Sequence, residues 1–470
     1  MTTAATPMVL QPDSAAIQAV LDHVSPLLGQ RLTSSREVCA QHGRDESYHP
    51  PCPPNAVAFP ETTEEVAAIV RACAAHRVPV IPFGTGTALE GHVIAVQGGL
   101  CIDLSRMNAI VAVRPEDMDV TVQAGVTRKQ LNAHLRDTGL FFPIDPGADA
   151  SLGGMAATRA SGTNAVRYGT MREAVLALTV VTASGEIVRT ARRARKSAAG
   201  YDLTRLFVGS EGTLGVITEV TLRLHGIPEC ILSAVCPFPS LRAAVDTVIE
   251  TIQHGVPIAR IELLDVNQIR AVNAYSKTDY AEAPTLFLEF HGSDAHAREQ
   301  VDTVQALAAE HGAEGFQWAE TLEDRNRLWQ ARHNAYYAGL ALKPGAKGFS
   351  SDVCVPISRL ADCIEETERD LAASSATTAI VGHVGDGNFH VLFVFDPDNA
   401  AEIAEAKRLN ARIVARALAM EGTCTGEHGI GLGKKSYLVQ EHGPEGVALM
   451  RAVKQALDPD GIMNPGKMLG

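Results

Sequence analysis

The chain has 470 residues, which is too long for a single hydrophobic core, so two or three domains are expected. Its hydrophobic content of 46% and charged content of 20% are typical of a globular protein, and its formal net charge of −13 argues against nucleic acid or an anionic membrane as an electrostatic partner. Its 9 cysteines include no Cys-x-x-Cys pair, so neither a disulfide framework nor an iron–sulfur ligand set is visible, and a reducing compartment is favoured.

The cellular location is predicted from the absence of membrane-spanning and signal segments in the sequence. No run approaches the length of a membrane helix, and residues 1–10 have neither a basic start nor an apolar signal segment. We therefore expect a cytoplasmic protein without a transmembrane segment, and peripheral attachment at the inner membrane stays open. The one basic cluster, residues 192–196 (RRARK), is interpreted as a solvated loop. The oligomeric state also stays open, a homodimer included.

The first elements predict a lead-in segment followed by an α/β pattern. Apolar residues at helical spacing indicate a helix over residues 13–30, and a loop follows it. The α/β pattern starts with a strand at 56–59. A helix then runs from an N-cap at Thr62 to about His76, and a second strand covers 78–81.

Loops of small residues recur from this point. The strand at 78–81 leads into residues 83–87 (FGTGT), where alternate glycines let backbone amides approach an anion and threonine hydroxyls add donors. This loop is neither a G-x-G-x-x-G fingerprint nor a P-loop. Similar loops follow at residues 146–155, 160–169 and 209–215. Because these loops carry few bulky side chains, we expect one long ligand, such as a dinucleotide, to lie against their backbone.

The ordered loops, together with residues 200–203 (GYDL), resemble the FAD-binding domain of the vanillyl-alcohol-oxidase type, or PCMH-type, flavoproteins. The resemblance spans about residues 50–225 and implies a two-part α/β FAD-binding domain at 51–227, after a lead-in helix and loop at 1–50. By this likeness, residues 84–87 hold the pyrophosphate.

The same resemblance implies how FAD is held. Some members attach flavin covalently through a histidine near the first loop. Residues 83–88 contain no histidine, since His92 follows the loop, so non-covalent FAD is expected. The implied cofactor-binding residues are Pro82, Gly84, Thr85, Gly86, Thr87, Pro146, Gly147, Ser151, Gly153, Gly154, Gly162, Asn164, Gly169, Glu211, Gly212, Ile217 and Asn464.

From about residue 228 the pattern changes to an α+β layer, with an antiparallel sheet covered by helices. Two rounds of strand–helix–strand are followed by further helices and strands. The predicted strands are at 231–236, 258–264, 285–289, 315–319, 351–355, 379–381 and 391–395, and the predicted helices are at 240–254, 295–311, 322–341, 357–374 and 398–420.

Residues 383–390 (HVGDGNFH) predict a hairpin, because Gly, Asp and Asn tolerate the positive φ of a tight turn. In a hairpin centred on the middle of this stretch, His383 lies directly opposite His390, and directly opposed residues have Cβ atoms roughly 4.5–5.5 Å apart. Residues 426–429 (GEHG) add the carboxylate of Glu427. Two imidazoles and one carboxylate leave coordination positions open, which suits a catalytic metal site better than a structural one.

This second half resembles the C-terminal domain of the FAD-linked 2-hydroxyacid dehydrogenases, through the two histidine-bearing motifs and residues 464–467 (NPGK). The resemblance implies an α+β substrate domain at 228–440 and a C-terminal segment at 441–470 that returns to the flavin. It also assigns His383, His390 and Glu427 as metal ligands and His428 as the base. Zinc suits this donor set, as do manganese and iron(II).

The resemblance also suggests the substrate. Arg332 matches the family's substrate arginine, which can grip a carboxylate through two parallel hydrogen bonds, and Lys347 and Tyr336 are assigned as further substrate contacts. Residues 351–358 (SDVCVPIS) resemble the cytochrome-type D-lactate dehydrogenases, and Leu392 stands where the D-2-hydroxyglutarate branch carries an Asn. D-lactate is therefore favoured, with D-2-hydroxyglutarate and glycolate as alternatives.

The electron acceptor is expected to be external, because no nicotinamide, iron–sulfur or haem motif is visible. A quinone, a cytochrome and an electron-transfer flavoprotein are all compatible. Two other classes stay open. A metallohydrolase would activate water at the same ligands and predicts no flavin. A non-catalytic flavin-binding subunit of an oxidase complex predicts a flavin that hydroxy acids do not reduce.

Overall fold

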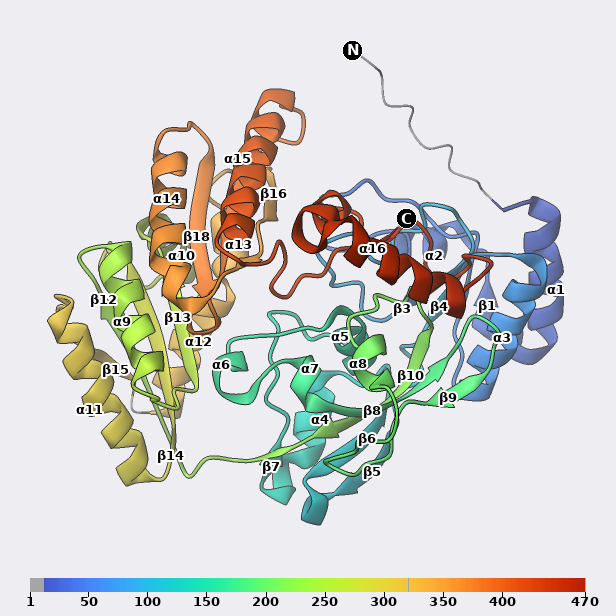
Figure 1. Cartoon of the computed structure of the whole chain (residues 1–470), viewed down its shortest axis with the longest axis horizontal. Helices are drawn as coiled ribbons and strands as arrows, with labels where there is room; N and C mark the ends of the chain where they lie inside the picture. Colours follow the sequence, from blue (N-terminus) through green and yellow to red (C-terminus); the bar gives the residue numbers. More distant parts are fainter. Residues whose placement is uncertain (1–11, 320, 470) are drawn as a thin grey trace.

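The N-terminal helix forms as its sequence pattern predicts. The computed structural model describes residues 12–319 and 321–469 (Figure 1). The expectations for residues 1–10 therefore lie outside the described part, as does Gly470 at the end of the expected C-terminal segment. Helix α1 (Ser14–Leu28) coincides with the predicted lead-in helix. Among the described residues, no helix combines the length and apolar character of a membrane span.

The first sheet has the order β1-β2-β4-β3, in which β2, β4 and β3 run parallel. Helix α3 begins after Thr62, whose hydroxyl accepts the Glu65 N–H, as expected for the N-cap. Helices α1 and α3 pack their apolar faces against this sheet. The bounds are β1 (Leu32–Thr33), α2 (Arg36–Gln41), β2 (Ala56–Ala58), α3 (Thr63–His76), β3 (Val80–Phe83) and β4 (Leu100–Asp103).

The second sheet is antiparallel, in the order β5-β6-β10-β8-β9, and a small pair β7-β11 lies beside it. Helices α4, α5, α7 and α8 share an apolar core with it. The two sheets form the two-part α/β unit expected for an FAD-binding domain. The bounds are β5 (Ile110–Arg114), β6 (Asp119–Gln123), α4 (Arg128–Leu135), β7 (Leu140–Phe141), α5 (Leu152–Thr158), α6 (Ala165–Tyr168), α7 (Met171–Ala174), β8 (Val175–Val181), β9 (Ile187–Arg189), α8 (Leu203–Phe207), β10 (Val216–Arg223) and β11 (His225–Gly226).

The third sheet is antiparallel throughout and has the order β15-β12-β14-β13-β18-β19-β16, with β17 also paired to β19. Helices α9, α11, α14 and α15 pack on one face, and α10, α12 and α13 pack on the other. The α+β expectation is confirmed. The bounds are β12 (Cys230–Pro237), α9 (Leu241–Gln253), β13 (Arg260–Leu264), α10 (Val266–Ser276), β14 (Thr285–Gly292), α11 (Asp294–Glu310), β15 (Gln317–Ala319), α12 (Leu322–His333), α13 (Ala335–Leu340), β16 (Lys347–Ser350), β17 (Val353–Cys354), α14 (Leu360–Ala372), β18 (Thr377–His383), β19 (Asn388–Phe395) and α15 (Ala400–Ala419).

Two predicted elements are interrupted in the structure. The helix expected at 322–341 is two helices, α12 and α13, which meet at Asn334. The prediction of one continuous strand at 351–355 is also wrong, because β16 ends at Ser350 and β17 starts at Val353. The gap contains Asp352, which is fully buried and accepts hydrogen bonds from polar groups instead of continuing the strand.

The predicted hairpin exists, but its register is shifted by two residues. A turn of 3-10 helix at residues 384–386 reverses the chain, so His383 pairs with Asn388 and His390 pairs with Val381. Because side chains alternate across a strand, a shift of two keeps both histidines on the same face, whereas a shift of one would have separated them. Their ring centroids lie 5.4 Å apart.

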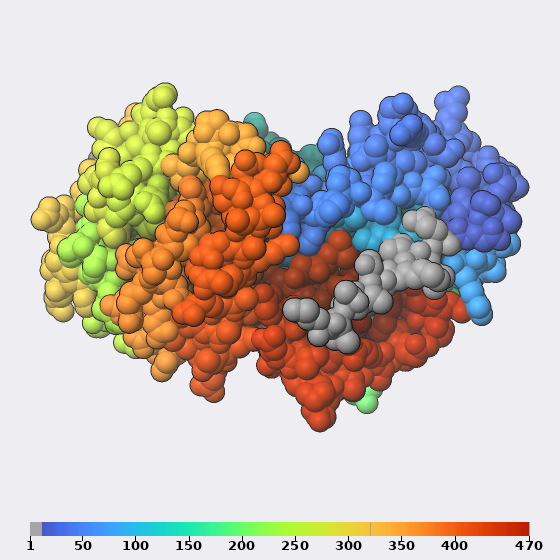
Figure 2. Space-filling view, turned by 90° about the horizontal axis from the view of Figure 1, so that it is seen from above, coloured from blue at the N-terminus to red at the C-terminus, as the bar shows by residue number. Residues whose placement is uncertain are grey.

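The C-terminal segment crosses back to the first sheet. Helix α16 (Leu438–Leu457) has a non-helical residue at Gly443, and the chain after it pairs with β3 through a bridge between Met463 and Val80. Ile462 and Met463 are buried in the core of the first sheet. In Figure 2 this red segment lies below the N-terminal part (blue) and beside the orange part of the chain.

Candidate active site

A cavity of about 380 Å³ lies between the small-residue loops and the third sheet. The loops contribute one wall, and strands β18 and β19 with helices α12 and α13 contribute the other. Most of the site residues expected from the sequence line this cavity. They are Pro82, Gly84, Thr85, Gly86, Thr87, Pro146, Gly147, Ser151, Gly153, Gly154, Gly162, Glu211, Gly212, Ile217 and Asn464 on the loop side, and Arg332, Tyr336, His383, His390, Glu427 and His428 on the other.

The loop wall is close-packed backbone. A Cβ on Gly162 would lie 2.5 Å from the carbonyl carbon of Asp145, so two loops touch through backbone alone. A Cβ on Gly212 would lie 3.0 Å from Pro82, and Gly212 has a φ of +72°, which favours glycine. A wall of this kind lets a ligand approach backbone amides closely, and this fits a dinucleotide.

Two of the expected cofactor residues connect the loop wall to later parts of the chain, Glu211 to the residues just after the GEHG loop and Asn464 to the C-terminal segment. The Glu211 carboxylate accepts the N–H groups of Ile430 at 2.7 Å and Gly431 at 2.8 Å, and it lies 3.2 Å from His92 Nε2. The Asn464 side-chain amide donates to the carbonyl oxygens of Glu211 at 2.7 Å and His92 at 3.0 Å. Glu211 and Asn464 therefore shape the cavity through their own protein contacts.

Three expected site residues do not line the cavity. Lys347 is exposed on strand β16. Asn164 is buried and donates its side-chain amide to the Pro143 carbonyl oxygen at 2.9 Å. Gly169 has a φ of +76° and lies against Glu173. The structure gives Asn164 and Gly169 structural contacts and places Lys347 outside the site.

The two hairpin histidines aim at one carboxylate oxygen. Oε1 of Glu427 lies 3.0 Å from His383 Nε2 and 3.3 Å from His390 Nε2. The Nδ1 atoms are held from behind, by Glu262 Oε1 at 2.8 Å for His383 and by the Ser351 carbonyl oxygen at 3.0 Å for His390. Two imidazoles and one carboxylate that converge in this way fit a divalent metal ion.

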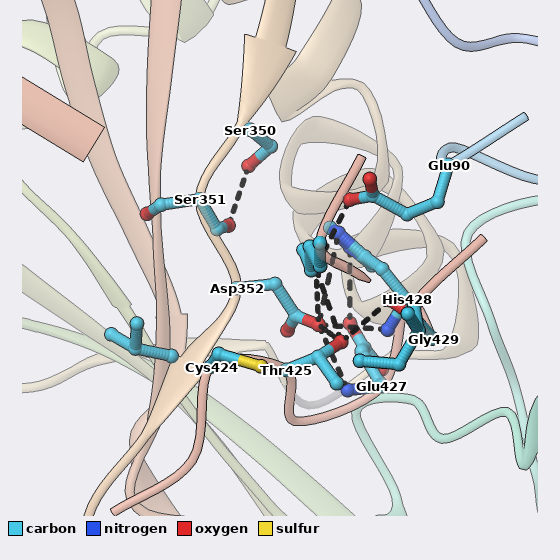
Figure 3. Close-up of polar contacts among 12 residues, drawn as sticks. Glu90, Ser350, Ser351, Asp352, Cys424, Thr425, Glu427, His428 and Gly429 are labelled. Atoms are coloured by element: carbon cyan, nitrogen blue, oxygen red, sulfur yellow. Dashed lines mark hydrogen bonds and ion pairs between the residues drawn. The ribbon is translucent and has the colours of Figure 1, made fainter. Parts of the chain in front are cut away.

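Asp352 fixes the loop that carries Glu427 and His428. Its Oδ2 accepts the N–H of Glu427 at 3.1 Å, the N–H of His428 at 2.8 Å and the Thr425 hydroxyl at 2.6 Å (Figure 3). Burial opposes ionisation, but the neighbouring His428 ring and the Lys434 ammonium hold the pKa of Asp352 well below its usual range. Asp352 also lies within 4.8 Å of the donor atoms of His390, Glu427 and His428. Its oxygens are already occupied as acceptors, so we assign it to positioning the loop.

His428 has the environment of a neutral base. Its ring stacks on His390, with centroids 4.9 Å apart and an interplanar angle of 9°. Its Nδ1 is buried without a hydrogen-bond partner among the described residues. Burial lowers the pKa of His428 to about 4, so the imidazole is neutral at pH 7 and can accept a proton.

Arg332 reaches the cavity in contact with a carboxylate that the sequence analysis missed. Its Nη2 lies 2.5 Å from Glu262 Oε2, and Glu262 also contacts His383. Burial opposes ionisation of Glu262, but the charges of His383 and Arg332 lower its pKa. A signal was present, because Glu262 interrupts the apolar strand expected at 258–264 and a buried carboxylate needs partners.

Lys434 was also missed. It is buried, and its Nζ lies 3.0 Å from Glu90 Oε1 and 3.2 Å from Asp352 Oδ2. Burial opposes its charged form, but Glu90 and Asp352 raise the pKa of Lys434. Glu90 follows the first glycine loop, so this ion pair joins the loop wall to the charged wall. No local sequence pattern marks it.

Comparison with known proteins matches both halves of the chain. The family described as FAD linked oxidases, C-terminal domain, matches residues 227–468, and the FAD binding domain family matches residues 54–191. The chain is 56% identical to the probable mitochondrial D-lactate dehydrogenase of Danio rerio, over 97% of this chain and 93% of that one. It is 48% identical to the mitochondrial D-lactate dehydrogenase [cytochrome] of Arabidopsis thaliana, over 96% and 80% respectively.

The fold is similar to a solved flavoprotein structure. The crystal structure of p-cresol methylhydroxylase with substrate bound aligns over 98% of this chain and 99% of its own, with a TM-score of 0.79 and 15% sequence identity. At this identity the likeness concerns the fold alone. It agrees with the two-part α/β unit and the attached antiparallel sheet.

Proposed function

The chain belongs to the FAD-linked oxidase family, and from this premise we propose that it oxidises a D-2-hydroxy acid, most favourably D-lactate to pyruvate. One observation carries the proposal. A base that is neutral at pH 7, His428, lines the same cavity as the converging donors of His383, His390 and Glu427. Arg332 lines the same cavity and offers a cation for the substrate carboxylate.

Each residue has a role in the proposed reaction. Arg332 binds the carboxylate and fixes the orientation of the substrate, and His428 takes the proton from the hydroxyl group. FAD, when bound, would supply the acceptor for the hydride from Cα, and a divalent ion, which His383, His390 and Glu427 would hold, would lower the pKa of the hydroxyl. The substrate thus loses one hydride and one proton and becomes a 2-oxo acid. We propose zinc as the ion, with manganese and iron(II) as alternatives.

The preference for a short acid rests on the end of the cavity near β19. Leu392 of β19 is buried and lines the cavity, as do the apolar residues Val381 and Ala335. An apolar end suits the methyl group of D-lactate better than a second carboxylate. D-lactate is therefore the favoured substrate, and D-2-hydroxyglutarate and glycolate are the alternatives.

Electrons leave the reduced flavin for an external acceptor, such as a quinone, a cytochrome or an electron-transfer flavoprotein. The relatives above are named as mitochondrial, so the cytoplasmic location inferred from the sequence stays a prediction. We also propose domain limits near residues 50, 227 and 440. The metallohydrolase alternative, which requires a protein without flavin, is not supported for a member of an FAD-linked family.

The deciding experiment is anaerobic reduction of the purified flavoprotein by a panel of D- and L-2-hydroxy acids. We expect D-lactate to bleach the flavin absorbance rapidly, a chelator to prevent the bleaching, and added Zn²⁺ or Mn²⁺ to restore it. Fast bleaching by an L-acid would overturn the stereochemistry, and chelator-resistant bleaching would overturn the metal role. If no acid bleaches a fully flavinated protein, the non-catalytic subunit becomes the better explanation.

A further inference from the structure

We propose that Glu262 is a positioning residue that holds a metal ligand and the substrate arginine at the same time. The inference rests on the proposed function, because it concerns the roles given there to His383 and Arg332. Glu262 is not itself among the residues that line the cavity. It lies behind two residues that do, and only 1% of its side chain is exposed.

The sheet register brings Glu262 to this place. Strand β13 pairs with β18 so that Leu263 lies opposite Gly382 and Leu264 lies opposite Val381. Continuing that register by one residue brings Glu262 beside His383 on the neighbouring strand. Leu264, two residues away and therefore on the same face, packs with helix α12, which carries Arg332. The carboxylate thus lies where the sheet and helix α12 meet.

The two oxygens of the carboxylate have different partners. Oε1 lies 2.8 Å from His383 Nδ1, and Oε2 lies 2.5 Å from Arg332 Nη2. An ionised carboxylate can only accept hydrogen bonds, so His383 Nδ1 carries a proton and donates it. This hydrogen bond fixes the ring so that Nε2, which lies 3.0 Å from Glu427 Oε1, is the nitrogen that can bind a metal once its own proton has left.

The second hairpin histidine is held differently. His390 Nδ1 contacts the Ser351 carbonyl oxygen, an uncharged acceptor of the backbone. No side-chain substitution removes that acceptor, whereas one substitution at Glu262 removes the acceptor of His383. The buried Nε of Arg332 has no acceptor among the described residues, and within this part of the chain Glu262 is the residue that holds the guanidinium by a hydrogen bond. Loss of Glu262 should therefore loosen the metal site and the carboxylate site together.

The chain offers a matched control on the next strand. Glu289 on β14 is also a buried carboxylate between a histidine and an arginine, with Oε1 2.8 Å from His291 Nε2 and 3.5 Å from Arg260 Nε. None of these three residues lines the cavity. Glu289→Gln therefore removes a buried carboxylate charge from the same sheet without removing a contact to His383 or Arg332.

The experiment compares Glu262→Gln, Glu289→Gln and the unchanged protein, each purified with FAD. Zn²⁺ affinity is measured by competition with a chromophoric chelator, and flavin content by absorbance. We expect Glu262→Gln to keep its FAD and to bind Zn²⁺ about 10- to 100-fold more weakly. Its KM for D-lactate at saturating Zn²⁺ should rise about tenfold, because the guanidinium is no longer fixed. Glu289→Gln should keep its Zn²⁺ affinity within about twofold, the margin of the measurement.

The outcomes separate the two proposals. Unchanged Zn²⁺ affinity in Glu262→Gln overturns the role toward His383, and an unchanged KM at saturating Zn²⁺ overturns the role toward Arg332. An equal loss of Zn²⁺ affinity in Glu289→Gln would mean that any buried carboxylate of this sheet has the effect, and it would also overturn the inference. If Glu262→Gln does not fold, Glu262→Asp keeps the charge but shortens the side chain by one methylene, and it should show a smaller loss in the same direction. Failure of the unchanged protein to be reduced by D-lactate would instead count against the proposed function, since the Zn²⁺ measurement needs no turnover.

Discussion

The cavity has two walls that are built on different principles. The loop wall, from residues 82–87, 146–163 and 211–217, consists largely of backbone and small side chains. Buried charges are concentrated behind the opposite wall, and each of Glu262, Asp352 and Lys434 has at least one oppositely charged partner. Backbone recognises a long ligand by shape, whereas buried charge performs chemistry but must be compensated. Binding of the cofactor and the reaction itself are therefore assigned to separate walls.

The walls are nevertheless joined at two points. Glu211 of the loop wall accepts two backbone N–H groups just after His428, and Lys434 links Asp352 to Glu90. These contacts place the base against the cavity from the loop side. Because the two walls differ in this way, a substitution in the loop wall should weaken FAD binding without weakening metal binding. A substitution in the charged wall should impair the reaction while FAD stays bound.

The largest effect is expected from a change in the charged wall. His428→Ala removes the proposed base, so kcat for D-lactate should fall by about 10²- to 10⁴-fold while FAD stays bound. Stopped-flow flavin reduction and the flavin-to-protein absorbance ratio measure both quantities. His254→Ala, a change at an exposed position on the end of helix α9, is the control and should behave as the unchanged protein. Near-normal reduction by His428→Ala would remove it as the base.

A change in the loop wall should have the converse effect. Gly162→Ala places a methyl group 2.5 Å from the Asp145 carbonyl carbon and forces the two loops apart. Overpacking of this kind costs about 1–3 kcal/mol, so FAD affinity should fall by roughly 10- to 100-fold, while Zn²⁺ affinity stays unchanged. Gly226→Ala is the control, because a Cβ there meets no atom within 4 Å. FAD titration of the apoprotein would contradict the assignment if both variants bind equally well.

The two walls also differ in how far the sequence predicts them. Each loop of the cofactor wall is a contiguous motif, so Gly84, Gly153 and Gly212 could be identified from short runs of sequence. His383 and His390 were found in the same way, and the error of two residues in the hairpin register did not matter because the face is retained.

The buried charges behind the other wall could not be predicted from short runs of sequence. Glu262 contacts His383 across 121 residues of chain, and Asp352 contacts His428 across 76. Such pairs depend on the register of β13 against β18 and on where β16 stops, and a single sequence shows neither. Asp352 was missed for the same reason, because the sequence predicted one continuous strand at 351–355 and did not show that β16 stops at Ser350.

A smaller effect is expected from a change at Leu392, an apolar residue that lines the cavity on the same side as the charged residues. Leu392→Asn places an amide at the buried end of the cavity, which should lower kcat/KM for D-lactate about tenfold, or about 1.4 kcal/mol, and favour D-2-hydroxyglutarate relative to it. Leu392→Met, which keeps the volume and the apolar character, is the control. Steady-state kinetics with both acids measure the ratio, and an unchanged ratio in Leu392→Asn would mean that the substrate tail is bounded by other residues.

The smallest effect concerns pH, and it tests whether the charged wall keeps its base neutral. A histidine with an ordinary pKa near 6.5 would be only about 3% neutral at pH 5, and a rate that needs the neutral form would fall roughly 30-fold from its value at pH 8. Burial lowers the pKa of His428 to about 4, so about nine tenths of the imidazole is still neutral at pH 5. A cation bound nearby lowers the pKa further, which moves the acid limb in the same direction. We therefore expect kcat/KM for D-lactate, measured at saturating Zn²⁺ at each pH, to change by less than about twofold between pH 8 and pH 5 and to fall only below that range. An acid limb centred near pH 6.5 would show instead that His428 is in contact with solvent when the substrate binds, and the separation of the two walls would then be less complete than the cavity suggests.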